Sequence, residues 1–163
     1  MLSSKMKQAL NKQINFEFFS SYLYLAMAAD FDAKNLDGCA AWMYAQAKEE
    51  WGHGMKMFKY INDQGEKVTL EAIETPRSEW KSPLEVFEQS HKHEQEVTKR
   101  ISGMMKLAQE ENDFATLAFL QWFITEQVEE ENNVATIADK LRMVGDSPQG
   151  IFMMDRALAS RAS

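Results

Sequence analysis

The sequence predicts an all-α fold: a four-helix bundle with a long crossover between its second and third helices and a short fifth helix at the C-terminus. Sparse helix breakers are the first reason, since seven Gly and three Pro among 163 residues are roughly half of average usage. The second reason is that apolar residues recur every three or four positions along four long segments. The third is a single stretch, around Pro76, in which this pattern is missing.

The first two segments predict a pair of antiparallel helices over residues 5–32 and 38–62. Residues 5–32 contain no Gly or Pro and follow Ser3, a residue type that caps helix N-termini. The helical pattern resumes at residue 38 after a short turn with the sequence Asn-Leu-Asp-Gly. A turn this short makes the two helices antiparallel neighbours.

Residues 63–82 lack helical periodicity and are predicted to form the crossover. An extended segment of about 20 residues reaches at most ~60 Å. The helix over 38–62 is only ~40 Å long at 1.5 Å per residue. The crossover can therefore run the whole length of the bundle and allow the third helix to start at the far end.

Two long helices and one short helix are predicted after the crossover, over 83–111, 113–144 and 148–159. Ser82 and Pro83, with Glu85 in the capping-box position, mark the start of the first. Gly145 ends the second, and a Ser-Pro pair then begins the short fifth helix.

Composition limits the function. The chain is 45% hydrophobic and 26% charged, which is typical of a globular protein, and we expect one domain over 1–163. A net charge of -7 gives no electrostatic basis for binding nucleic acid or an anionic membrane, so cationic partners are favoured. The single Cys39 and an N-terminus without a signal-peptide pattern predict a cytoplasmic protein.

Polar residues interrupt the apolar stripe of each long helix close to its midpoint. Because these helices are nearly equal in length, the interruptions are expected at one level of the bundle, within about one turn of each other. Carboxylates buried together must be protonated or must bind a metal. Several carboxylates with one His suit iron or manganese better than structural zinc. The residues concerned are Glu17, Glu50, His53, Glu94, Gln127 and Glu130.

Several residues near these positions have an ordinary structural interpretation. The acidic run 126–131 could be a solvated helix face, but Gln127 and Glu130 share the phase of the apolar stripe. His91 and His93 lack ligand partners at helical spacing and are left out of the site. Tyr24 lies two turns from Glu17, where it either packs in the core or hydrogen-bonds a ligand carboxylate and donates an electron.

The residues around these positions resemble those of the non-haem ferritins of bacteria and archaea. The resemblance covers nearly the whole chain, and its motifs occur in order on four helices: Asn-Phe-Glu17-Phe-Phe-Ser-Ser-Tyr, Glu49-Glu50-Trp-Gly-His53, His-Lys-His-Glu94 and Glu126-Gln127-Val-Glu129-Glu130. It implies a single ferritin-like di-iron domain.

The resemblance also implies a set of iron ligands. Glu17, Glu50 and His53 would hold one iron. Glu50, Glu94 and Glu130 would hold a second, with Glu50 bridging the two and Gln127 beside them as a hydrogen-bonding partner. A third iron site in similar proteins corresponds here to Glu49, Glu126, Glu129 and Glu130. No haem is expected, because the residue at the position of the haem-binding Met is Gly52.

The function that the resemblance implies is iron storage with ferroxidase activity: Fe(II) is oxidised by dioxygen or hydrogen peroxide and kept as ferric mineral in a hollow homo-oligomer of 24 subunits. Surplus apolar residues on the first helix also favour association; they are Phe18, Phe19, Tyr22, Leu23, Leu25 and Met27. One alternative is a di-metal carboxylate oxidase or peroxidase that acts on an external substrate. Another is a metal-free structural bundle, which would leave unpaired carboxylates in the core.

Overall fold

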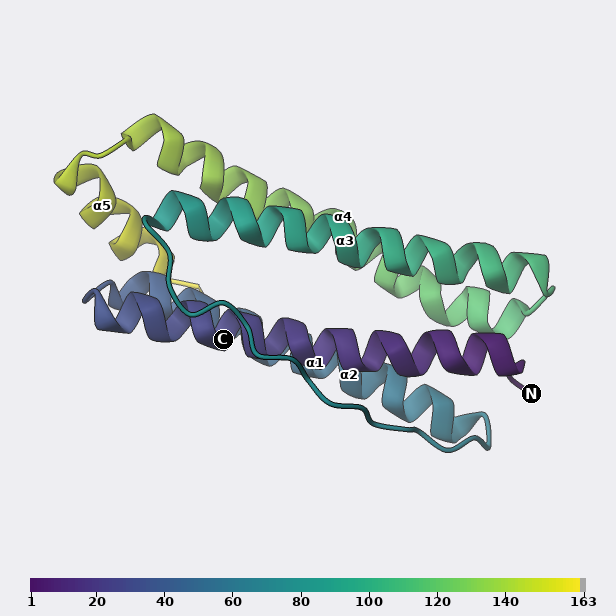
Figure 1. The fold of residues 1–163 in the computed structure, drawn as a ribbon. Coiled ribbons are helices and arrows are strands. Elements are labelled where there is room, and N and C mark those ends of the chain that lie inside the picture. The colour runs from purple at the N-terminus through teal and green to yellow at the C-terminus, as the bar shows by residue number, and fades with distance from the viewer. Residues whose placement is uncertain (162–163) are drawn as a thin grey trace.

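The computed structural model describes residues 1–161, which form five helices and no strand within that range. Their bounds are α1 Ser4–Ala33, α2 Asp37–Asp63, α3 Pro83–Glu110, α4 Phe114–Val144 and α5 Pro148–Leu158. Two antiparallel pairs, α1 with α2 and α3 with α4, lie against each other, and α5 packs across one end (Figure 1). The predicted all-α bundle with a long crossover and a short fifth helix is confirmed.

Side chains cap the start of four helices, α1, α3, α4 and α5, and the caps are Ser3, Ser82, Asp113 and Ser147. Ser3 Oγ accepts a hydrogen bond from the Met6 amide at 3.0 Å, and Ser82 Oγ accepts one from the Glu85 amide at 3.2 Å. Ser147 caps α5 in the same manner. Each cap satisfies an amide that has no partner inside its own helix.

Residues 64–82 run along the bundle beside α1 as an extended chain, which is the teal segment without helical coils in Figure 1. Asn15 Nδ2 donates to the carbonyl oxygens of Glu71 at 3.2 Å and Ala72 at 3.1 Å. One turn earlier on α1, Asn11 Oδ1 accepts a hydrogen bond from the Thr69 amide at 2.8 Å. These contacts hold the crossover on the bundle surface, and α3 can then begin at the opposite end from where α2 stops.

The core consists of two apolar halves separated by a polar layer. One half is built around residues such as Phe31 and Phe87, and the other around residues such as Leu10 and Ile101. The buried glutamates of the four long helices lie between them in sequence and are 0–3% exposed. Apolar burial and close packing on both sides of this layer stabilise the fold. The polar groups are therefore held in place by the two apolar halves around them.

The surplus of apolar residues on α1 is only partly buried within the chain. Phe18, Leu23 and Met27 are in the core, whereas Tyr22 and Leu25 remain 51% and 41% exposed. No helix within residues 1–161 is long and apolar enough to cross a membrane.

Candidate metal centre

Six side chains from all four long helices point into the polar layer. α1 supplies Glu17, α2 supplies the pair at 50 and 53, α3 supplies Glu94, and α4 supplies the pair at 127 and 130. Pairs three residues apart on one helix lie on the same face, so each pair enters the layer together. All six residues, Glu17, Glu50, His53, Glu94, Gln127 and Glu130, are between 0% and 6% exposed.

Their ligand atoms form two overlapping groups. Glu17, Glu50 and His53 each offer one atom within 4.8 Å of the others, and Glu50, Glu94 and Glu130 do the same. The Glu50 carboxylate belongs to both groups, and it can therefore bridge two neighbouring cations. One group contains an imidazole, whereas the other contains carboxylates alone.

Amide side chains hold the carboxylates of the centre. Gln13 Nε2 donates to Glu17 Oε1 at 2.8 Å. Gln46 Nε2 donates both to Glu50 Oε1 at 2.9 Å and to Glu130 Oε2 at 2.8 Å. Glu17 Oε2 is buried without a hydrogen-bond partner. A buried carboxylate oxygen that lacks a donor is costly unless a cation completes it, and this orphaned atom fits a metal ligand.

Glu94 receives donors from two sides. The Tyr24 hydroxyl donates to Glu94 Oε1, and Gln127 Nε2 donates to Glu94 Oε2 at 3.1 Å. Tyr24 is fully buried, so it both packs in the core and hydrogen-bonds a carboxylate of the centre. Gln127 lies where the sequence places it, beside the second group of carboxylates.

The pKa values of the clustered carboxyl groups are all raised when no cation is bound. Burial, followed by the charge of Glu50, raises the pKa of Glu17 well above its ordinary value, and burial followed by the charge of Glu94 does so for Glu50. Burial raises the pKa of Glu94 to about 7. Burial and then the charge of Glu94 raise the pKa of Glu130 to about 8. A divalent cation would replace these protons and remove the repulsion.

The residues expected at a third site are brought together only in part. Glu126 Oε1 lies 3.9 Å from His53 Nε2, and these two residues form a further group with Glu130. Neither Glu49 nor Glu129 belongs to any group of three ligand atoms within the described residues. Both are exposed, and Glu49 Oε2 instead accepts a hydrogen bond from Arg161 at 2.8 Å.

His93 is a neighbour of the centre without being one of its ligands. Its Nε2 lies 2.7 Å from Ser20 Oγ, and its ring stacks on Phe16 at 5.0 Å between centroids. Burial, followed by the charge of Arg100, lowers the pKa of His93 to about 4, which keeps the imidazole neutral. His91 and His93 are absent from every ligand group found among residues 1–161.

Three residues that support the centre were missed by the sequence reasoning. Gln13 and Gln46 each lie four positions before a ligand, on the same helix face, and that spacing is a usable signal. Arg161 gives no such signal, because it meets Gln46 across 115 residues of chain.

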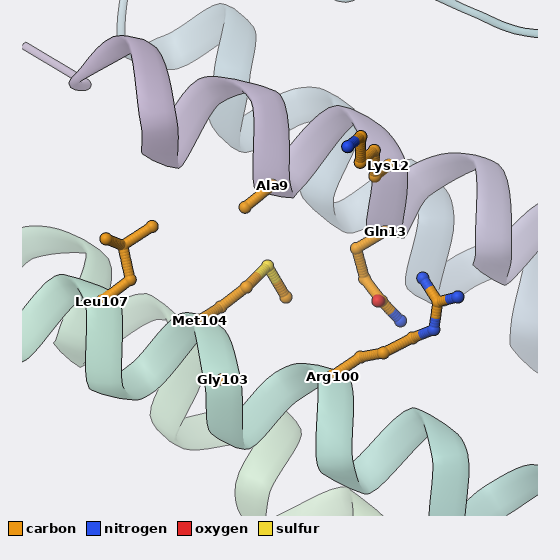
Figure 2. Close-up of a pocket in the computed structure, with 7 residues that line it drawn as sticks. All are labelled: Ala9, Lys12, Gln13, Arg100, Gly103, Met104 and Leu107. Atoms are coloured by element: carbon orange, nitrogen blue, oxygen red, sulfur yellow. The ribbon is translucent and has the colours of Figure 1, made fainter.

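A surface pocket of about 240 Å³ lies between α1 and α3 and borders this region (Figure 2). Figure 2 shows Gln13 and Arg100 reaching toward each other from the two helices at one side of the pocket. Gln13 lines the pocket and donates a hydrogen bond to Glu17, whereas Glu17 does not line the pocket. Gln13 is itself only 2% exposed. The pocket therefore ends one side chain short of the candidate ligands.

Comparisons with known proteins agree with the resemblance noted from the motifs. The ferritin-like domain family matches residues 7–144. A bacterial non-heme ferritin from Staphylococcus haemolyticus is 42% identical over 162 residues, covering 99% of this chain and 98% of the relative. An open pore ferritin from the hyperthermophilic archaeon Archaeoglobus fulgidus has a TM-score of 0.98 at 47% identity, with 99% of each chain covered. A humanized archaeal ferritin has a TM-score of 0.98 at 46% identity, covering 99% of this chain and 98% of the other.

Proposed function

This chain belongs to the ferritin family, and on that premise we propose that it stores iron and that its buried carboxylate centre oxidises Fe(II) to Fe(III) beforehand. The observation that carries the proposal is the pair of ligand groups that share Glu50. Two cations held next to each other can deliver two electrons to one oxidant molecule, which a single Fe(II) ion cannot do. Iron is here the substrate of the centre.

In this proposal Glu17, Glu50 and His53 bind the first Fe(II), and the carboxylates of the second group bind the other. The orphaned oxygen of Glu17 supports the first assignment, because an iron ion supplies the partner that the protein lacks. Each Fe(II) loses one electron. Dioxygen accepts the pair with two protons to give hydrogen peroxide, and hydrogen peroxide accepts a pair with two protons to give two water molecules.

The two ion positions differ in a way that favours release of ferric iron. The second group contains oxygen ligands only, because α4 offers Gln127 and Glu130 and has no counterpart of His53. Imidazole is a good ligand for transition metals, so its absence weakens retention of the second ion. Iron would move from there toward Glu126 and then to a third site completed by Glu49, Glu129 and Glu130.

Storage requires an assembly, because the bundle interior is filled by two apolar half-cores and the polar layer. The mineral must therefore lie between subunits, and a hollow shell of 24 copies is part of the proposal. The exposed Tyr22 and Leu25 on α1 support a subunit contact. A cytoplasmic location is proposed as well, and cell fractionation would test it.

The function is tested by adding Fe(II) aerobically to the purified protein and following ferric absorbance and the iron that stays soluble. We expect hundreds or more ferric ions per assembly, and sedimentation should report a large particle before loading. Glu50→Ala removes the shared ligand and is expected to slow the initial oxidation at least tenfold. Glu110→Ala, which removes a glutamate with a 61% exposed side chain from α3, is the matched control. Binding of a few ions per chain without mineral would contradict storage.

The alternative of an oxidase acting on an organic substrate requires a route for that substrate to the two ions. The pocket in Figure 2 stops at the buried Gln13, which favours small oxidants over organic molecules. Retention of a metal pair through chelation and gel filtration, with no mineral formed, would support this alternative.

A further inference from the structure

Arg161 follows α5 and makes four contacts with α2. Its Nη1 donates to the Trp42 carbonyl oxygen at 3.2 Å, and its Nη2 donates to Gln46 Oε1 at 2.9 Å and to Glu49 Oε2 at 2.8 Å. The guanidinium carbon also lies 4.2 Å from the centroid of the Trp42 ring. The Arg161 side chain is only 18% exposed as a result. A planar guanidinium with several donors satisfies this set of partners, whereas a lysine ammonium would not.

These contacts place Arg161 one side chain away from the metal centre. Gln46 is fully buried, and its amide nitrogen donates to Glu50 and Glu130, which belong to the candidate ligand groups. The amide oxygen of Gln46 is already paired with Arg161. The amide orientation is thus fixed from outside, with its donor end directed at the carboxylates.

Glu49 is the point at which Arg161 meets the proposed path of iron. The third ligand group among residues 1–161 contains His53, Glu126 and Glu130, but Glu49 is absent from it while paired with the guanidinium. A carboxylate oxygen that accepts a guanidinium donor is not free for a divalent cation, and the two positive charges repel each other.

We propose that Arg161 is a positioning residue that withholds Glu49 from the metal centre, so that a third iron ion and the Arg161 guanidinium compete for the same carboxylate. This rests on the proposed function, because it concerns iron that leaves the two-ion centre. The first two ions bind without disturbing Arg161. The third ion binds only when the guanidinium leaves Glu49.

The structure provides space into which the guanidinium can withdraw. A pocket of about 350 Å³ lies beside it and is lined by Trp42, Asn132, Asn133 and Thr136 among others. The amide and hydroxyl groups of these side chains offer acceptors to a displaced guanidinium. Rotation of one side chain is therefore sufficient, and α5 can stay in place.

The test is an anaerobic titration of the assembled protein with Fe(II). Calorimetry measures the affinity of each ion, and equilibrium dialysis counts the ions bound. Arg161→Gln is expected to tighten binding of the third ion by roughly fivefold, the size expected when a partly exposed charge pair is removed. The first two ions should change less than twofold, because the Gln46 amide nitrogen still donates to Glu50 and Glu130 after its oxygen has lost Arg161. Arg161→Lys keeps the charge without the planar fork and should give an intermediate affinity. Arg156→Gln removes the same charge from an exposed position on α5 and is the matched control.

A double-mutant cycle separates competition from a purely structural role. If Arg161 acts through Glu49, Arg161→Gln has no further effect on third-ion binding once Glu49→Gln is present. A structural role alone would lower the thermal midpoint and leave third-ion affinity unchanged. Equal third-ion affinity in the wild type and Arg161→Gln overturns the proposal, and so does the absence of a third ion in both. Failure of the proposed function would give a different result: Fe(II) would bind normally but would not be oxidised when air is admitted.

Discussion

The metal-free protein should lose stability as pH rises from 5 to 8, and this follows from the raised carboxyl pKa values. Glu94 and Glu130 have pKa values of about 7 and about 8 in the folded chain, against 4.5 for an ordinary glutamate. Between these limits the folded chain holds more protons than the unfolded chain. The free energy of unfolding therefore falls with rising pH, by at most about 1.4 kcal/mol per pH unit for each group.

Between pH 5 and pH 8 the shifts correspond to a loss of roughly 2.5 kcal/mol for Glu94 and roughly 3.5 kcal/mol for Glu130. The charge of Glu94 is itself one cause of the Glu130 shift, so these amounts overlap and the loss for the pair is expected to be about 5 kcal/mol. Denaturation of demetallated protein by guanidinium chloride, followed by circular dichroism at pH 5, 6, 7 and 8, measures this loss.

Glu130→Gln isolates the contribution of the cluster from the rest of the chain. The neutral amide cannot titrate, and the substitution also removes one carboxylate that repels Glu50, so the loss of unfolding free energy between pH 5 and 8 should shrink by roughly 3 kcal/mol. Glu17 and Glu50 keep their raised pKa values and leave a residual pH dependence. Saturating Zn(II) should reverse the slope, because metal binding competes with protons and strengthens as pH rises. A metal-free wild type whose stability is flat or rises between pH 5 and 8 would refute the reasoning.

Two further substitutions test individual contacts. Tyr24→Phe removes the hydroxyl that donates to Glu94 but none of the candidate ligands. The rate of Fe(II) oxidation, measured by stopped flow, should therefore fall by less than about tenfold. A loss of rate as large as that of Glu50→Ala would assign Tyr24 an electron-transfer role instead. Gly54→Ala places a Cβ 2.6 Å from Phe18 Cε1, so the ring must move. The free energy of unfolding, measured by chemical denaturation, should fall by about 1–3 kcal/mol. An unchanged or raised denaturation midpoint would show that the ring can move without cost.

Helix positions followed from local signals in the sequence. The caps Ser3 and Ser82 act on amides three residues away, and the stop at Gly145 depends on its own positive φ of 56°. Such effects are contained within one turn, so residue types alone predict them. The convergence of the ligands was also predictable, because Glu17, Glu50 and their counterparts interrupt apolar stripes whose phase fixes the buried face.

The sequence by itself determined which helices form and which candidate ligands enter the core. Only the tertiary structure decided what completes the centre: the Tyr24 hydroxyl on Glu94 across 70 residues, and Arg161 on Glu49 across 112. Helical periodicity fixes the face on which a side chain lies, but it carries no information about which atom of another helix stands opposite. That depends on how the four helices slide and rotate as their apolar halves pack, and packing involves the whole chain at once.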